Sequence, residues 1–138
     1  DPATETRYVP HVMGVQAGQK LQIKSSDATS HNVHYISVEN GEDNFGMSKP
    51  GTKERQFNSP EAKFVKFKCD VHPWMGAWVG VKSHPFFATT GTDGTYTIKN
   101  VPPGEYSLVM LHESLGEQRA KITVETARAT TQDFVLKK

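Results

Sequence analysis

Apolar and polar residues alternate in many short segments of the chain. Because successive side chains of a β-strand point to opposite faces, this pattern predicts strands with one buried face. In the segment 65–69, for example, Val65, Phe67 and Cys69 share one face, and Lys66 and Lys68 share the other. The other predicted strands are Leu21–Lys24, Thr95–Lys99, Glu105–Met110, Lys121–Val124 and Asp133–Leu136, with one more starting near Trp78–Val81.

Turn-forming pairs separate these segments. They are Ala17-Gly18, Asn40-Gly41, Pro50-Gly51, Asp93-Gly94 and Pro102-Pro103-Gly104. Short strands at near-regular spacing with Gly and Pro turns are typical of an all-β sandwich. The segment from Glu42 to Pro60 is mixed and polar, and we interpret it as a loop-rich crossover rather than a pair of strands.

Composition excludes several classes of protein. The chain has 138 residues, with 16 Lys and Arg against 15 Asp and Glu, which gives a net charge of +1. This balance excludes a nucleic-acid binder driven by bulk charge and an acidic disordered tail. No apolar run approaches the roughly 18 residues that span a bilayer. No leader-like segment opens the chain, so we expect Asp1 to begin a mature or trimmed product.

The most informative motif is a short loop that carries three potential metal ligands. Cys69, His72 and Met75 are each separated by two residues. A thiolate, an imidazole and a thioether are soft or borderline ligands that suit copper rather than magnesium or calcium. The segment Ser30–His34 offers further imidazoles. Two His, one Cys and a weak axial Met describe a type 1 copper site for electron transfer.

Other interpretations of these residues remain open. A single buried Cys is often only a small apolar residue. Zinc is the main rival metal, although zinc seldom binds a thioether and the chain has one Cys. A protein that stores or delivers copper, and a structural β module with incidental copper, are the alternative functions. We do not expect an enzyme, because the sequence carries one complete ligand set.

Residues 8–82 resemble the cupredoxins. The run His31-Asn32-Val33-His34-Tyr35 and the loop Cys69-x2-His72-Pro73-Trp74-Met75 are most similar to the ligand segments of the amicyanins. The resemblance implies that one type 1 copper is bound by His31, Cys69, His72 and Met75. It also implies that Asn32 links the two ligand segments by hydrogen bonds. Asp70 departs from the family, in which a neutral hydroxyl residue is usual, so the resemblance leaves this link in question.

The whole chain resembles bacterial secreted proteins that join a cupredoxin to a carboxypeptidase regulatory-like β-sandwich. The similarity continues through Ser83–Ala88, Thr92–Leu108 and His112–Gly116. It implies a cupredoxin domain at 1–84 and a non-catalytic regulatory-like lobe at 85–138. The expected fold is therefore all-β, with a cupredoxin-like Greek-key sandwich packed against a smaller, prealbumin-like C-terminal lobe. We expect that lobe to be incomplete on its own, with about five strand-like segments.

The remaining metal-binding residue types have structural interpretations. Alternation places His34 on the opposite strand face from His31. Met47 is expected to fill apolar space rather than to bind metal. We expect structural roles for His11, His84 and His112, with an accessory metal site as the alternative.

The cupredoxin resemblance also implies a setting and partners. It implies an extracytoplasmic, such as periplasmic, electron carrier that docks redox partner proteins near His72 and Trp74. Candidates for an apolar docking patch are Pro10, Met13, Pro50, Pro73 and Trp74. We expect a monomer whose two lobes dock within one chain, with a homodimer as the second choice.

Overall fold

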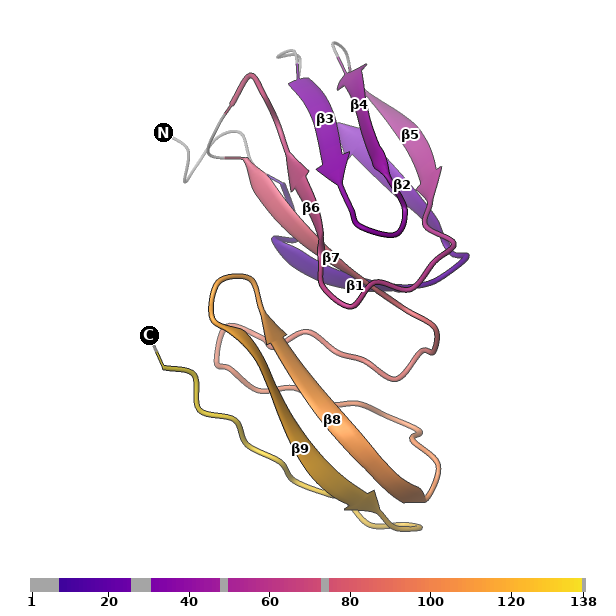
Figure 1. Ribbon diagram of the computed structural model, residues 1–138, viewed down its shortest axis with the longest axis vertical. Helices are drawn as coiled ribbons and strands as arrows, with labels where there is room; N and C mark the ends of the chain where they lie inside the picture. The colour runs from indigo at the N-terminus through magenta and orange to yellow at the C-terminus, as the bar shows by residue number, and fades with distance from the viewer. Residues whose placement is uncertain (1–7, 26–30, 48–49, 73–74, 138) are drawn as a thin grey trace. The chain divides into compact units, whose positions relative to one another are not determined.

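The computed structural model describes residues 8–25, 31–47, 50–72 and 75–137 (Figure 1). Strands are the only regular elements in these ranges. They are β1 (Val12–Gln16), β2 (Lys20–Ser25), β3 (His31–Ile36), β4 (Glu42–Met47), β5 (Gly51–Gln56), β6 (Val65–Lys68), β7 (Gly76–Lys82), β8 (Gly104–His112) and β9 (Gly116–Val124). The predicted all-β fold is confirmed. In the described residues, no helix is long and apolar enough to cross a membrane.

The chain consists of two compact units, Asp1–Tyr96 and Thr97–Lys138. The domain boundary expected between residues 84 and 85, and the docking of the two lobes, stay predictions.

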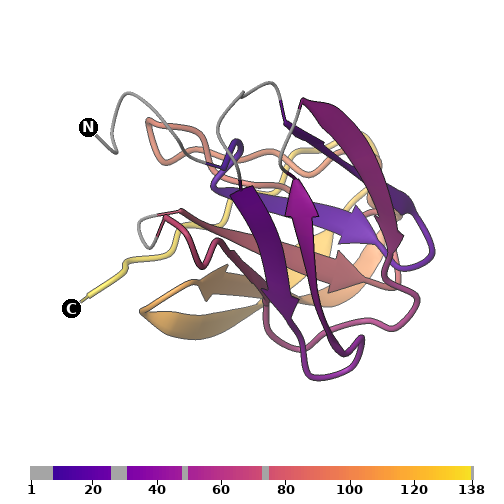
Figure 2. The same ribbon diagram turned by 90° about the horizontal axis from the view of Figure 1, so that it is seen from above.

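The first unit is built on a five-stranded sheet in the order β1-β7-β6-β3-β4. β1 runs parallel to β7, and the other neighbours are antiparallel. β2 and β5 form a separate pair, which lies behind β3 and β4 in Figure 1 and above them in Figure 2. Leu21 and Ile23 of β2 pack against a buried cluster from the larger sheet that includes Val33, Tyr35 and Phe67. This part of the chain is therefore a sandwich with its core between the strand layers.

The predicted alternation along β3 and β6 is confirmed. Val65, Phe67 and Cys69 are buried, whereas Lys66 is exposed and Lys68 is half-buried. In β3, the buried positions His31, Val33 and Tyr35 alternate with more exposed ones. Both strands present one face to the core and the other toward solvent.

The prediction of a loop-rich crossover at Glu42–Pro60 is wrong, because this segment contains β4 and β5. β4 has Asp, Asn and Gly, which are poor strand formers by themselves, but it pairs with β3 over six residues. β5 pairs only with β2 and is exposed along most of its length, so its sequence lacks the apolar alternation used as a signal. Cross-strand pairing rather than local preference determines both elements.

The second unit contains one long hairpin. β8 and β9 pair over nine positions, so both strands are longer than predicted. The strands predicted at Thr95–Lys99 and Asp133–Leu136 are not formed; the latter segment is held by Gln118 Nε2, which donates to the carbonyl of Val135 at 2.7 Å. Their apolar alternation is real, but neither segment joins the two-stranded ladder.

The apolar residues on the strand segments predicted after residue 94 are half-buried or exposed. They include Tyr96, Ile98, Tyr106, Leu108, Ile122, Val124, Phe134 and Leu136. All fully buried residues that the structure describes lie between Val15 and Val81.

Two glycines create a gap on one face of the first unit. Gly14 of β1 and Gly80 of β7 are direct neighbours in the sheet. The Phe87 ring covers Gly14 so closely that a Cβ there would lie 2.6 Å from it, and Phe64 lies 3.9 Å from the equivalent position at Gly80. The segment that follows β7 is thereby fixed against the sheet.

We predict that Gly14→Ala lowers the free energy of unfolding by about 1–3 kcal/mol, because the added methyl group must displace the Phe87 ring. Urea unfolding measures the effect. Gly46→Ala in β4 is the matched control, because nothing lies within 4 Å of its Cβ position. In a Phe87→Ala background the cost of Gly14→Ala should largely disappear, whereas strictly additive effects would show that Phe87 is not the obstacle.

Candidate metal centre

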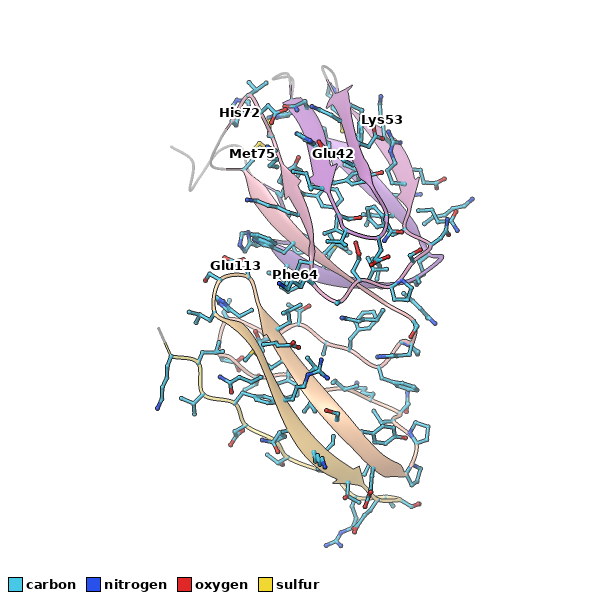
Figure 3. All side chains as sticks on the ribbon, viewed as in Figure 1. Glu42, Lys53, Phe64, His72, Met75 and Glu113 are labelled. Carbon is cyan, nitrogen blue, oxygen red and sulfur yellow. The ribbon has the colours of Figure 1, made fainter. Side chains whose placement is uncertain are left out.

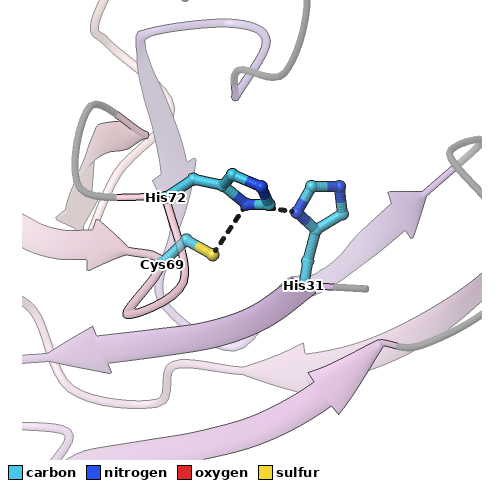
Figure 4. A group of neighbouring side chains, drawn as sticks. All are labelled: His31, Cys69 and His72. Carbon is cyan, nitrogen blue, oxygen red and sulfur yellow. Dashed lines mark hydrogen bonds between the residues drawn. The ribbon is translucent and has the colours of Figure 1, made fainter. Parts of the chain in front are cut away.

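Three of the predicted ligands come together at one end of the five-stranded sheet. The side chains of His31, Cys69 and His72 offer ligand atoms that all lie within 4.8 Å of one another (Figure 4). Nδ1 of His72 lies 3.1 Å from Nδ1 of His31 and 3.7 Å from Sγ of Cys69. Among the residues that the structure describes, this is the only group of three or more such side chains arranged to hold a metal ion.

Strand geometry explains why these side chains converge. His31 opens β3 on its inward face, and Cys69 follows β6 on the same inward face as Phe67. His72 lies in the loop that leads to β7, where its carbonyl accepts a hydrogen bond from the Met75 N–H at 2.9 Å. His31 is 7% exposed and Cys69 is 2% exposed, whereas His72 is half-buried. Pro73 and Trp74 lie outside the described residues.

Met75 lies immediately before β7 and is 6% exposed. Figure 3 shows His72 and Met75 at the same end of the unit. Although buried, Met75 is not part of the hydrophobic core cluster, whereas Met47 is part of it and pairs directly with His31. These positions fit an apolar role for Met47 and a location for Met75 beside the ligand loop. The full set of four ligands stays a prediction.

The spacing of the three donor atoms fits a bound metal ion. Metal–nitrogen bonds of about 2.0 Å and metal–sulfur bonds of about 2.3 Å place two nitrogens roughly 3.3 Å apart, and nitrogen and sulfur roughly 3.5 Å apart, at tetrahedral angles. The corresponding distances are 3.1 and 3.7 Å. Thiolate and imidazole together suit copper or zinc rather than magnesium or calcium. The donor set therefore fits the copper that the sequence predicts.

Asn32 connects the two ligand segments. Its Oδ1 accepts a hydrogen bond from the backbone N–H of Asp70 at 2.7 Å and lies 3.4 Å from Sγ of Cys69, which donates to it. The link that the resemblance implies is therefore present despite the carboxylate at position 70. It survives because the donor is a backbone group, which does not depend on the side chain.

His34 lies on the opposite face from His31, as predicted. Its Nε2 is 2.7 Å from Oε2 of Glu42, and its Nδ1 is 3.4 Å from Oδ1 of Asp70. The hydrogen bond with Glu42 raises the pKa of His34 above its ordinary value of 6.5. Partial burial alone would raise the pKa of Asp70, but hydrogen bonds with Asn32, His34 and Asn44 hold that pKa below its ordinary value.

Two of the other expected structural histidines hold local turns, and the third contacts a neighbouring segment. His84 Nδ1 accepts from the N–H of Phe86 at 3.1 Å, and His112 Nδ1 accepts from the N–H groups of Ser114 and Leu115 at 3.1 and 3.0 Å. The ring of His11 lies with Nδ1 3.0 Å from the carbonyl oxygen of Gly76. These contacts support structural roles for the three residues.

Sequence reasoning missed two residues near the centre. Asn44 lies in the segment interpreted as a crossover, yet its side chain contacts both Asn32 and Asp70. Tyr8 donates its hydroxyl hydrogen to the carbonyl of Lys68 at 3.0 Å. Burial, followed by the charges of Cys69 and Asp70, raises the pKa of Tyr8 well above its usual range. The unusual Asp70 was the available signal for Asn44, because a partly buried carboxylate needs hydrogen-bond donors around it.

Residues 71–137 match the family model of the carboxypeptidase regulatory-like domain. The matched range begins inside the ligand loop and crosses from the first unit into the second. Among solved structures, the chain is similar to a novel purple cupredoxin from Nitrosopumilus maritimus, with 22% sequence identity and a TM-score of 0.45. That match covers 53% of this chain and 79% of the other. No curated protein matches the chain. The regulatory-like resemblance noted in the sequence therefore appears in the family match.

We predict that the imidazole of His34 titrates above pH 6.5 and that Glu42→Gln lowers this pKa, because the substitution removes the charge that stabilises the imidazolium. Because the folded-state pKa is raised, the contribution of His34 to stability is present below its unfolded pKa. It is lost as the pH rises through its folded pKa. NMR chemical shifts of the ring recorded against pH measure the effect.

The matched control for this titration is Glu54→Gln. Glu54 is a similarly exposed carboxylate on β5 that pairs with Lys20 instead. A His34 pKa that does not change in Glu42→Gln would show that the ion pair with Glu42 is not the cause.

Proposed function

We propose that the protein is a type 1 copper protein that carries single electrons between partners outside the cytoplasm. The observation that supports this most strongly is the convergence of His31, Cys69 and His72, with Met75 buried at the end of the same loop. Copper, when bound there, supplies a one-electron couple between Cu(I) and Cu(II). No bond of a substrate is made or broken, so the protein is not an enzyme.

Each proposed ligand has a distinct part in this function. Cys69 supplies a thiolate from a site that excludes solvent, and His31 supplies a buried imidazole from the sheet. Met75 would supply a thioether to the copper. His72 is the least buried of the three converging side chains, so its ring is the route by which electrons enter and leave.

The rigid setting of these ligands favours electron transfer over copper delivery. His31 pairs with Met47 across β3 and β4, Cys69 directly follows β6, and Asn32 links the two ligand segments by hydrogen bonds. A carrier benefits from such a frame, because a site that does not rearrange has a low reorganisation cost. A copper storage or delivery protein would need ligands that can let the ion go, and that function is the second candidate.

The surface near the ligand loop supports docking of a redox partner. Pro10 and Pro50 are exposed and Val71 next to His72 is 58% exposed, whereas Met13 packs partly against the core cluster. Small apolar patches of this kind suit brief encounters between proteins. We propose an extracytoplasmic redox partner protein that docks at this end, with the carrier acting as a monomer.

We predict that the copper-loaded protein has an intense visible absorption band that disappears completely in Cys69→Ser. The thiolate is the source of the charge-transfer transition, and a hydroxyl group cannot replace it. His112→Ala is the matched control. It also removes an imidazole, but His112 holds the turn between β8 and β9 and is not a proposed ligand. An intense band in Cys69→Ser would overturn the type 1 assignment.

We also predict that the bond lengths between metal and ligands change little between the Cu(I) and Cu(II) forms. X-ray absorption spectroscopy of both forms gives these lengths directly. Loss of a ligand on reduction, together with rapid transfer of Cu(I) to a chelator, would favour the delivery function instead.

A further inference from the structure

A closed set of hydrogen bonds lies beside the ligand loop and is centred on Asp70. Oδ2 of Asp70 accepts from Nδ2 of Asn32 at 2.9 Å and from Nδ2 of Asn44 at 3.1 Å. Nδ2 of Asn32 also donates to Oδ1 of Asn44 at 2.8 Å. Asn32, Asn44 and Asp70 therefore form a ring that joins β3, β4 and the loop after β6.

This ring fixes which way the Asn32 amide points. Both N–H groups of its Nδ2 are directed to Asn44 and Asp70, so Oδ1 is left to face the loop. There Oδ1 accepts from the backbone of Asp70 and from Sγ of Cys69. A rotated amide would place a donor against the Asp70 N–H. The carboxylate thereby determines the orientation of the group that contacts the sulfur.

A second pair of contacts holds the carboxylate itself. His34 Nδ1 lies 3.4 Å from Oδ1 of Asp70, and Lys68 Nζ lies 3.8 Å from the same oxygen. The Asp70 side chain is 46% exposed, and ion pairs at such exposure contribute little to global stability. The expected effect of Asp70 is therefore on local position rather than on the melting temperature.

We propose that Asp70 is a positioning residue of the metal centre, which acts through Asn32 to hold the sulfur of Cys69 in place. The inference rests on the proposed function for its biological meaning, because Cys69 is the proposed thiolate ligand. The positioning of the Cys69 sulfur by Asp70 can be tested in the metal-free protein and does not depend on that function. Cys69 is 2% exposed, so a thiol reagent reaches it only when the loop opens.

The first experiment measures how fast Cys69 reacts with a soluble aromatic disulfide in the metal-free, full-length protein, well below its melting temperature. In Asp70→Ala the rate should rise roughly tenfold, which is the scale expected when one or two hydrogen bonds that hold the loop are lost. Asp70→Asn should stay near the original rate, because its carbonyl oxygen can still accept from both amides. A normal rate in Asp70→Asn would show that Asp70 acts by accepting hydrogen bonds rather than by its charge.

Two further variants complete the test. Glu54→Ala is the matched control, because Glu54 is a similarly exposed carboxylate on β5 that pairs with Lys20 rather than with a member of the ring. In an Asn32→Ala background, Asp70→Ala should add little, since Asp70 acts through that amide. The proposal would be overturned if Cys69 in Asp70→Ala reacted at the rate of the unsubstituted protein, or if Cys69 reacted equally fast in Asp70→Ala and Asp70→Asn.

The copper-loaded variants supply a spectroscopic readout. The visible band and the electron paramagnetic resonance spectrum should shift in Asp70→Ala and return in Asp70→Asn. If all of the loaded proteins lack the band while the thiol rates behave as expected, the proposed function fails and the positioning role stands. If the band is present and the thiol rate of Asp70→Ala stays at the original value, the positioning role fails and the proposed function stands.

Discussion

The candidate site depends on the register between β3 and β6. His34 pairs with Lys68 and Tyr35 pairs with Phe67 in an antiparallel ladder. Continuing this register past the end of β6 brings Asp70 to Asn32, as their hydrogen bonds show, and brings the following loop to His31. A slip by one residue would turn His31 and Cys69 away from each other's face, because side chains alternate. The buried apolar residues of both strands prevent such a slip.

The candidate ligands could be proposed from the sequence because their signal is local. The spacing of Cys69, His72 and Met75 and the alternation around Cys69 are readable without knowing any partner strand. β4 and β5 could not be predicted in this way, because one is rich in residues that disfavour strands and the other is exposed on most of its length. The hydrogen bonds of Asp70 with Asn44 were equally hidden, since they follow from the pairing of β4 with β3.

The two units differ in how their strands are supported. In the first, two strand layers enclose a cluster in which Val65 and Val81 are completely buried. The second has a two-stranded ladder without a fully buried residue in its described part, and two-stranded ribbons are marginally stable in water. The alternation in Thr95–Lys99 and Asp133–Leu136 predicted more strands there because it marks a preference for extended backbone. A ladder additionally requires a neighbouring strand with free hydrogen-bonding groups.

The burial of Cys69 has a consequence for the reactivity of its thiol. A chain with a single thiol can lose it by coupling to another molecule, which is a constant hazard wherever oxidants are abundant. With 2% of the residue exposed, the sulfur is shielded from large reaction partners, while a small ion needs far less room to reach it. The same packing that brings Cys69 to His31 and His72 thus also limits which reagents can reach the thiol.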